Sequence, residues 1–182
     1  VPEPILNAFF KANLWHVLIT TDLDHITGQY QHGAATHHYK NYLNETMMVV
    51  RALELRGEHE VARRLLETFL ANQGVRGLPG NFRTSQGVLY AAHPQEPDPY
   101  TAQGYNMHHG WGLAAAAEHY RWTKDRAWLA AVSPRLVAAA DWITRERQAT
   151  QFRLPDGLRP VEFGLPPAGD LEDVEEYLYW YA

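Results

Sequence analysis

The stretch NETMMVVRALELRGEHEVARRLLETFLANQG, residues 44–74, decides the fold class because it reads as two helices around one tight turn. On both sides of Gly57 the apolar residues recur at the spacing of an amphipathic helix. Asn44 is suited to cap the first helix, and a glycine such as Gly57 commonly ends one. We therefore predict helices over residues 44–56 and 58–73, joined as an αα-hairpin.

A similar unit follows about 67 residues later, around WTKD, residues 122–125. It predicts helices over residues 105–123 and 126–147. A break is expected at Ser133-Pro134, because proline disfavours a helical conformation in the residue before it. Each hairpin is followed by a long connection rich in glycine and proline. Repeated αα-hairpins with their long connections on one rim are typical of an α/α toroid.

The remaining segments complete this expectation. We predict a helix over residues 4–20, a turn over 22–28, a loop over 30–42, short β-hairpins over 82–90 and 151–163, and a helix start over 170–182. The predicted fold class is all-α: an α/α-hairpin toroid with short β-hairpins in its long loops. A closed toroid of six hairpins needs about twelve helices of ~11–12 residues. Residues 1–182 are therefore predicted to be a single domain that is a fragment of a larger (α/α)6 barrel.

The composition excludes several classes of protein. A net charge of −5 over 182 residues makes a nucleic-acid or anionic-membrane partner unexpected. The absence of cysteine excludes disulfides, thiolate metal sites and a cysteine nucleophile. No apolar run approaches the roughly 20 residues of a membrane span. Because the first residue is Val1, we interpret the chain as processed or as a piece of a longer one, and its compartment stays open.

Aromatic residues and histidines are frequent, with six Trp, ten Tyr and ten His. Such a composition fits a site that stacks on sugars, and a Trp-rich helical core gives the same count. Tyr105, His108, His109 and Trp111 lie at a predicted helix start, directly after a long connection. This is the rim at which a toroid places its site, so these residues are candidate sugar contacts.

Three blocks of the sequence resemble the six-hairpin glycosidases, the (α/α)6-barrel enzymes that include glucoamylase-like and debranching-type families. The blocks are residues 44–53 with Gly57, residues 62–63, 69–70 and 77–80; residues 111–129 with 140–143; and residues 164–167 with 173–176. The resemblance covers most of residues 42–182. It implies hydrolysis of a glycosidic bond in an oligo- or polysaccharide by general acid/base catalysis, without a cofactor.

The resemblance also implies roles for individual residues. The general acid of the family corresponds to Glu175, with Glu176 beside it, although Val174 stands where the family has tryptophan. The family's sugar-binding Arg–Asp pair falls near Asn44 and Glu45, with asparagine in place of arginine. The catalytic base of the family comes from a later helix, so the activity is expected to be incomplete in this chain.

The residues themselves leave two interpretations of the acidic segment, residues 170–176, open: it carries a catalytic acid, or it is an ordinary helix start. Glycoside hydrolysis normally needs two carboxylates, and Glu175 lies among four other acids in residues 170–176. Acids at a helix start also interact favourably with the helix dipole, which explains the same run structurally.

Three further interpretations of the sequence concern a metal site and two alternative functions. No metal is expected, because adjacent histidines in a helix, as in residues 37–38 and 108–109, point about 100° apart. One alternative function is a sugar epimerase of the same barrel type that uses histidines. Another is a non-catalytic helical scaffold, which could self-associate as a homodimer through the exposed half-barrel face.

Overall fold

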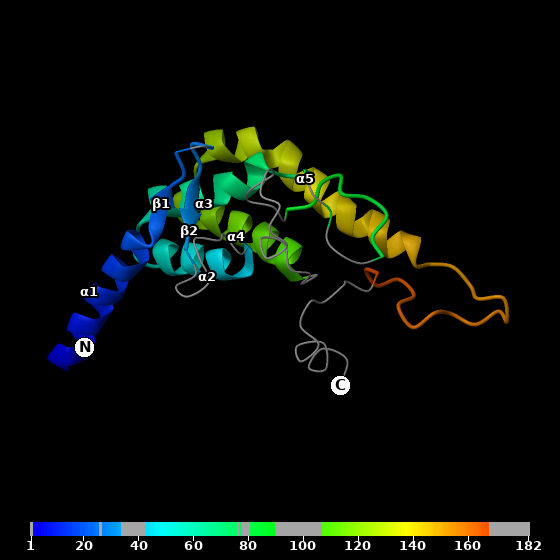
Figure 1. Cartoon of the computed structure of the whole chain (residues 1–182), viewed down its shortest axis with the longest axis horizontal. Coiled ribbons are helices and arrows are strands. Elements are labelled where there is room, and N and C mark those ends of the chain that lie inside the picture. Colours follow the sequence, from blue (N-terminus) through cyan, green and yellow to red (C-terminus); the bar gives the residue numbers. More distant parts are fainter. Residues whose placement is uncertain are drawn as a thin grey trace.

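The computed structural model describes residues 2–25, 27–33, 43–75, 77, 81–89 and 107–167, and these are mostly helical. The predicted all-α class is therefore confirmed. The elements in chain order are α1 (Pro4–Ile19), β1 (Thr21–Leu23), β2 (Tyr30–His32), α2 (Leu43–Glu54), α3 (His59–Ala71), α4 (Met107–Thr123) and α5 (Arg126–Ala149) (Figure 1). The predicted helix start at residues 170–182 lies outside the described residues.

Helices α2 and α3 form the predicted hairpin. Gly57 has a φ of 81°, a conformation that glycine adopts without steric cost, and the amide of Glu58 donates to the carbonyl of Leu53 at 3.0 Å. The chain can therefore reverse within a few residues. The facing sides of the two helices bury the main core; its members here are Leu43, Met47, Val50, Leu53, Ala62, Leu65, Leu66, Phe69 and Leu70.

Helices α4 and α5 form the second predicted hairpin. Lys124 takes a left-handed φ of 54°, and the carboxylate of Asp125 caps α5 by accepting the amide of Trp128 at 2.9 Å. The predicted break at Ser133-Pro134 is wrong, because α5 runs through Pro134 without interruption. Packing explains this result: Val132 and Ala139 are buried on both sides of the proline, which itself faces solvent.

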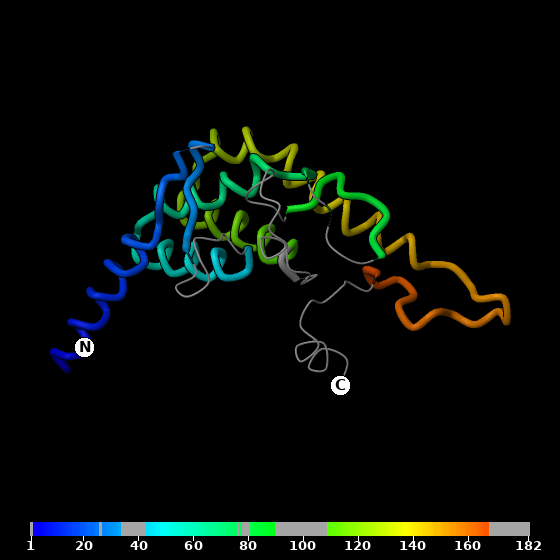
Figure 2. Tube along the Cα trace, in the orientation of Figure 1, coloured from blue at the N-terminus to red at the C-terminus, as the bar shows by residue number. Residues whose placement is uncertain are grey.

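The two hairpins pack with α2 and α4 side by side and parallel (Figure 2). At one end Gly112 of α4 lies against Leu43 of α2, and at the other end His119 of α4 contacts Glu54 of α2. Helices α3 and α5 run in the opposite direction and cover this pair on one side (Figure 1). The short turns thus gather at one end, and the chain enters α2 and α4 at the other.

The N-terminal arm differs from the prediction. Helix α1 matches the expected helix, but Asp22 and Leu23, predicted as turn, lie in β1, and residues 30–32, predicted as loop, form β2. The two strands are antiparallel and pair Thr21 with His32. The hairpin is fastened to α3, because Thr68 donates to the carbonyl of Tyr30 at 2.7 Å and Arg64 donates to its hydroxyl at 3.1 Å. Strands of three residues carry too little alternation to stand out from a turn.

The long connections also differ from the prediction. Residues 82–89 and 151–163 contain no strand, so the β-hairpin predicted over residues 151–163 is wrong, and the one predicted over residues 82–90 is wrong for its described residues. Residues 151–159 are exposed and make only a tight turn, in which Leu154 accepts from Gly157 and donates to Leu158, each at 2.8 Å. A two-stranded ribbon without a buried face gains too little to persist in water. Among the described helices, none has the length and apolarity needed to cross a membrane.

Candidate functional site

The first turn of α2 and the first two turns of α4 meet at one irregular segment, residues 81–89, which we call the rim loop. Gly112 allows this meeting, since a Cβ at that position would lie 3.2 Å from the side chain of Leu89 and 3.6 Å from that of Leu43. Asn44 follows Leu43 in the sequence, with Glu45 one position further on, and Trp111 precedes Gly112. The structure thus brings two of the three predicted blocks of site residues to one end of the molecule, which we call the loop end.

The backbone of the rim loop is hydrogen-bonded to a buried carboxylate of α5. Glu146 of α5 is 1% exposed, and its two oxygens accept the amide of Arg83 at 3.2 and 3.0 Å. One of these oxygens also accepts the amide of Thr84 at 3.1 Å. Hydrogen bonds from backbone amides to a charged acceptor are strong, and they satisfy donors that the loop cannot pair within itself.

The carbonyl groups of the rim loop are bound as well. The indole of Trp142 donates to Thr84 at 2.6 Å, and the guanidinium of Arg145 donates to Gln86 at 2.6 Å. Gln73 donates to the carbonyl of Gly87 at 2.9 Å. Gly87 has a φ of 99°, and a Cβ there would lie within 2.9 Å of the carbonyl carbon of Ala138. The loop backbone therefore lies directly on α5, where only glycine fits.

His109 of α4 also binds the rim loop. Its Nδ1 accepts the amide of Leu89 at 3.0 Å, while Nε2 donates to the carbonyl of Ala139 at 2.8 Å. The ring also packs on Trp142, with centroids 4.6 Å apart. Burial lowers the pKa of His109, and the hydrogen bond to Ala139 opposes this effect. A neutral imidazole is the form that fits, because an Nδ1 that accepts a hydrogen bond carries no proton.

The predicted site residues have different surroundings. Asn44 is half-buried and Glu45 is exposed in the first turn of α2, and Trp111 is half-buried against the main core. His109 is 1% exposed with both ring nitrogens bound to the backbone, so it joins loop to helix rather than facing solvent. Tyr105, the side chain of His108, Glu175 and Glu176 lie outside the described residues, and their roles stay predictions.

Sequence reasoning missed Glu146, although a signal for it was present. The buried stripe of α5 includes Trp128, Val132, Ala139 and Trp142, and Glu146 continues it four residues further on. A glutamate in an apolar stripe needs a hydrogen-bonding partner when it is buried. Such a position therefore marks a contact with backbone or with a cation.

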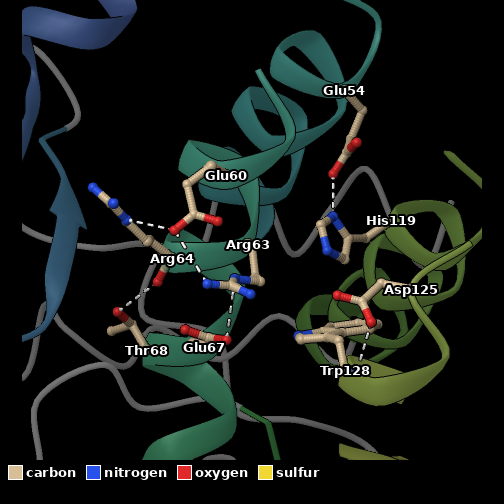
Figure 3. Close-up of polar contacts among 9 residues, drawn as sticks. All are labelled: Glu54, Glu60, Arg63, Arg64, Glu67, Thr68, His119, Asp125 and Trp128. Carbon is tan, nitrogen blue, oxygen red and sulfur yellow. Dashed lines mark hydrogen bonds and ion pairs between the residues drawn. The ribbon is translucent and has the colours of Figure 1, made fainter. Parts of the chain in front are cut away.

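A second group of residues missed in the sequence lies at the opposite end, beside the short turns. The carboxylate of Glu54 is fully buried and accepts from Nδ1 of His119 at 2.5 Å (Figure 3). It also accepts from Nδ1 of His59 at 2.5 Å. The ring of His119 meets that of Trp128 edge-on, with centroids 4.5 Å apart. We call Glu54, His59 and His119 the turn-end cluster. It ties α2 to both α3 and α4.

A metal centre has no support within the residues that the structure describes. They contain no group of three or more His, Asp or Glu side chains arranged to hold an ion. In the turn-end cluster the Nδ1 atoms of both imidazoles donate to the carboxylate of Glu54. These are hydrogen bonds to the glutamate, and the two rings are not arranged as ligands of a common ion.

Comparison with protein-family models, with curated proteins and with solved structures finds no match for this chain.

Proposed function

We propose that this chain is part of a glycoside hydrolase of the α/α-toroid type and binds an oligo- or polysaccharide at its loop end. One observation carries the proposal. The parallel helices α2 and α4 begin at the same end, and the rim loop lies against them there. Glu45, Asn44 and Trp111, which carry a carboxylate, an amide and an indole, are within two residues of that contact in the sequence. In toroids built from αα-hairpins, the long connections of one rim form the site.

The side chains available at this end suit a sugar. Glu45 and Asn44 offer hydrogen-bond acceptors and donors for hydroxyl groups, and the half-buried indole of Trp111 offers a flat apolar surface for a pyranose face. The rim loop supplies a wall whose backbone is already ordered. Ordering before binding lowers the entropic cost of association.

The catalytic roles in this proposal follow the resemblance. Glu175 is the general acid and Glu176 lies next to it in the chain, while Asn44, Glu45, Tyr105, His108 and Trp111 contact the sugar. His109 has a different role from the one expected, because its two nitrogens are used in holding the rim loop. For the same reason an epimerase that uses His109 as its acid or base is not favoured.

Oligosaccharide binding tests the proposal without requiring a second catalytic carboxylate. Calorimetric titration of the wild-type chain with a panel of oligosaccharides should show saturable binding. Trp111→Phe at the loop end keeps an aromatic ring but gives a smaller stacking face than the indole, so it should weaken binding about threefold. Trp122→Phe is the matched control, since Trp122 belongs to the same helix but lies beside the short turn. A flat response of the wild type across the panel would overturn the proposal.

A second candidate function, a self-associating scaffold, rests on a different observation. Helix α1 is apolar around its circumference and leaves Ile5, Phe9, Trp15 and Ile19 between 65% and 77% exposed. Helices of this kind are usually buried against something. Light scattering over a range of concentrations tests this candidate: a mass that rises toward that of a dimer supports it, and a constant monomer mass contradicts it.

A further inference from the structure

The rim loop has no regular secondary structure, yet its backbone is bound almost continuously by side chains of other elements. From Arg83 to Leu89, four residues donate or accept a backbone hydrogen bond with a side chain of α5 or α4. Phe82 adds an aromatic contact with Trp142, at 5.2 Å between centroids. A connection that only had to span two helices would not need such fastening.

Among these contacts, the one that Glu146 makes has the largest desolvation cost. A carboxylate that is 1% exposed loses its hydration, and the ion pairs found among the described residues include none with Glu146. Its charge is stabilised by the amides of Arg83 and Thr84 alone among the contacts found, at 3.0–3.2 Å. The guanidinium of Arg83 is directed elsewhere, to the carbonyl of Ala149 at 3.0 Å.

We propose that Glu146 is a positioning residue of the carbohydrate site: it fixes the rim loop in the shape that faces the bound sugar. This inference rests on the proposed function. Glu146 has no contact with the sugar itself, and it acts through Arg83 and Thr84. The loop that it fixes continues to Leu89, which lies against Gly112 in the second turn of α4 and donates its amide to His109 in the first turn. Release of the loop at Glu146 therefore changes the wall of the site without removing a sugar contact.

The test compares Glu146→Gln with Asp141→Asn, which removes an exposed carboxylate from the same helix. Glutamine keeps the size of the side chain but replaces one acceptor oxygen with a donor NH2, which faces the amide of Arg83 or Thr84. Hydrogen exchange monitors the amides of residues 81–89, circular dichroism monitors the helices, and calorimetry measures the Kd for the oligosaccharide that the wild type binds.

We expect Glu146→Gln to keep the helical spectrum, to speed exchange in the rim loop at least about tenfold, and to weaken sugar binding by about tenfold. Asp141→Asn should change none of these. Glu146→Asp, which keeps the carboxylate, should restore part of the affinity. Faster exchange with an unchanged Kd would overturn the inference while the proposed function stands. Unchanged exchange would overturn it as well. Absence of binding by the wild type would overturn both.

If Glu146→Gln does not fold, Arg145→Met gives the same test from the exposed side of the helix. Arg145 is exposed and donates to the carbonyl of Gln86, so its loss loosens the rim loop without opening the core. A Kd increase together with faster exchange in residues 81–89 supports the inference, and faster exchange alone contradicts it.

Discussion

The two ends of the paired hairpins each bury one glutamate, but they use it differently. At the turn end, Glu54 accepts from two imidazoles, so side chain meets side chain between elements that are already regular. At the loop end, Glu146 accepts from two backbone amides, so a side chain organises a segment that has no regular structure. The difference indicates that the turn end holds the helices together, whereas the loop end holds a surface in shape.

The largest expected effect is at the turn end, where Glu54→Ala leaves two histidines without their shared acceptor. Removing one partner of a buried polar cluster typically costs about 3–5 kcal/mol. We expect the free energy of unfolding in urea to fall by about that amount. Glu60→Ala is the control, since Glu60 is an exposed acid of α3 and should change stability by less than about 1 kcal/mol. Equal losses in the two variants would contradict the assigned role of Glu54.

The next largest effect distinguishes steric contact with α5 from backbone strain, by comparing alanine substitutions at two glycines. Gly87 and Gly157 both have a left-handed φ, of 99° and 82°, but only Gly87 lies against α5. Gly157→Ala should cost about 1 kcal/mol through φ alone, and Gly87→Ala about 2–3 kcal/mol because its Cβ meets the Ala138 carbonyl. Urea unfolding measures both. A smaller loss for Gly87→Ala would show that the rim loop does not rest on α5 as described.

Acid should weaken the loop end through His109. Its pKa is lowered by burial, so the unfolded chain, with a pKa near 6.5, takes up the proton first. The contribution of His109 is full above about pH 6.5 and is lost as the pH falls toward the folded pKa, at no more than about 1.4 kcal/mol per pH unit. His109→Gln should flatten the dependence of unfolding free energy on pH.

The control for this pH dependence is His32→Gln. Burial also lowers the pKa of His32, which lies on β2, away from the rim loop. Its replacement should flatten the pH dependence of stability while leaving hydrogen exchange in residues 81–89 unchanged. An acid-induced rise of exchange in the rim loop that persists in His109→Gln would contradict the role given to His109.

The smallest expected effect is on the cap of α5. Asp125→Ala removes the carboxylate that accepts the Trp128 amide, at a typical cost of about 1 kcal/mol. Thermal unfolding followed by circular dichroism measures this loss. Because the cap lies at the turn end, hydrogen exchange in the rim loop should stay as in the wild type, and a loosened rim loop would contradict the independence of the two ends.

The hairpins were predictable because their signals are local. Gly57 and the apolar period on both sides of it are enough to place α2 and α3 within two residues of their bounds. The break predicted at Ser133-Pro134 was wrong, because burial of Val132 and Ala139 outweighs the low helix propensity of that one residue pair. The three-residue strands β1 and β2 gave no pattern long enough to read.

The candidate site was predictable only as a position along the chain. The parallel packing of α2 and α4 brings their starts to the same end, where Gly112 lies against Leu43, and so places the segments that carry Asn44, Glu45 and Trp111 at that end. The partners of His109 and Glu146 and the contact of Glu54 with His119 could not be predicted, because these contacts join residues between 20 and 65 positions apart. Tertiary packing alone decides such pairs.

The role of the loop end as the functional surface is tested most directly by a hydrogen-exchange footprint of the wild-type chain with and without a bound oligosaccharide. We expect protection at the loop end, in residues 43–50, 81–89 and 109–113, and no change at the turn end, in residues 53–62 and 119–128. Protection confined to the turn end, or binding without any protection of the rim loop, would contradict the claim that the loop end is the functional surface.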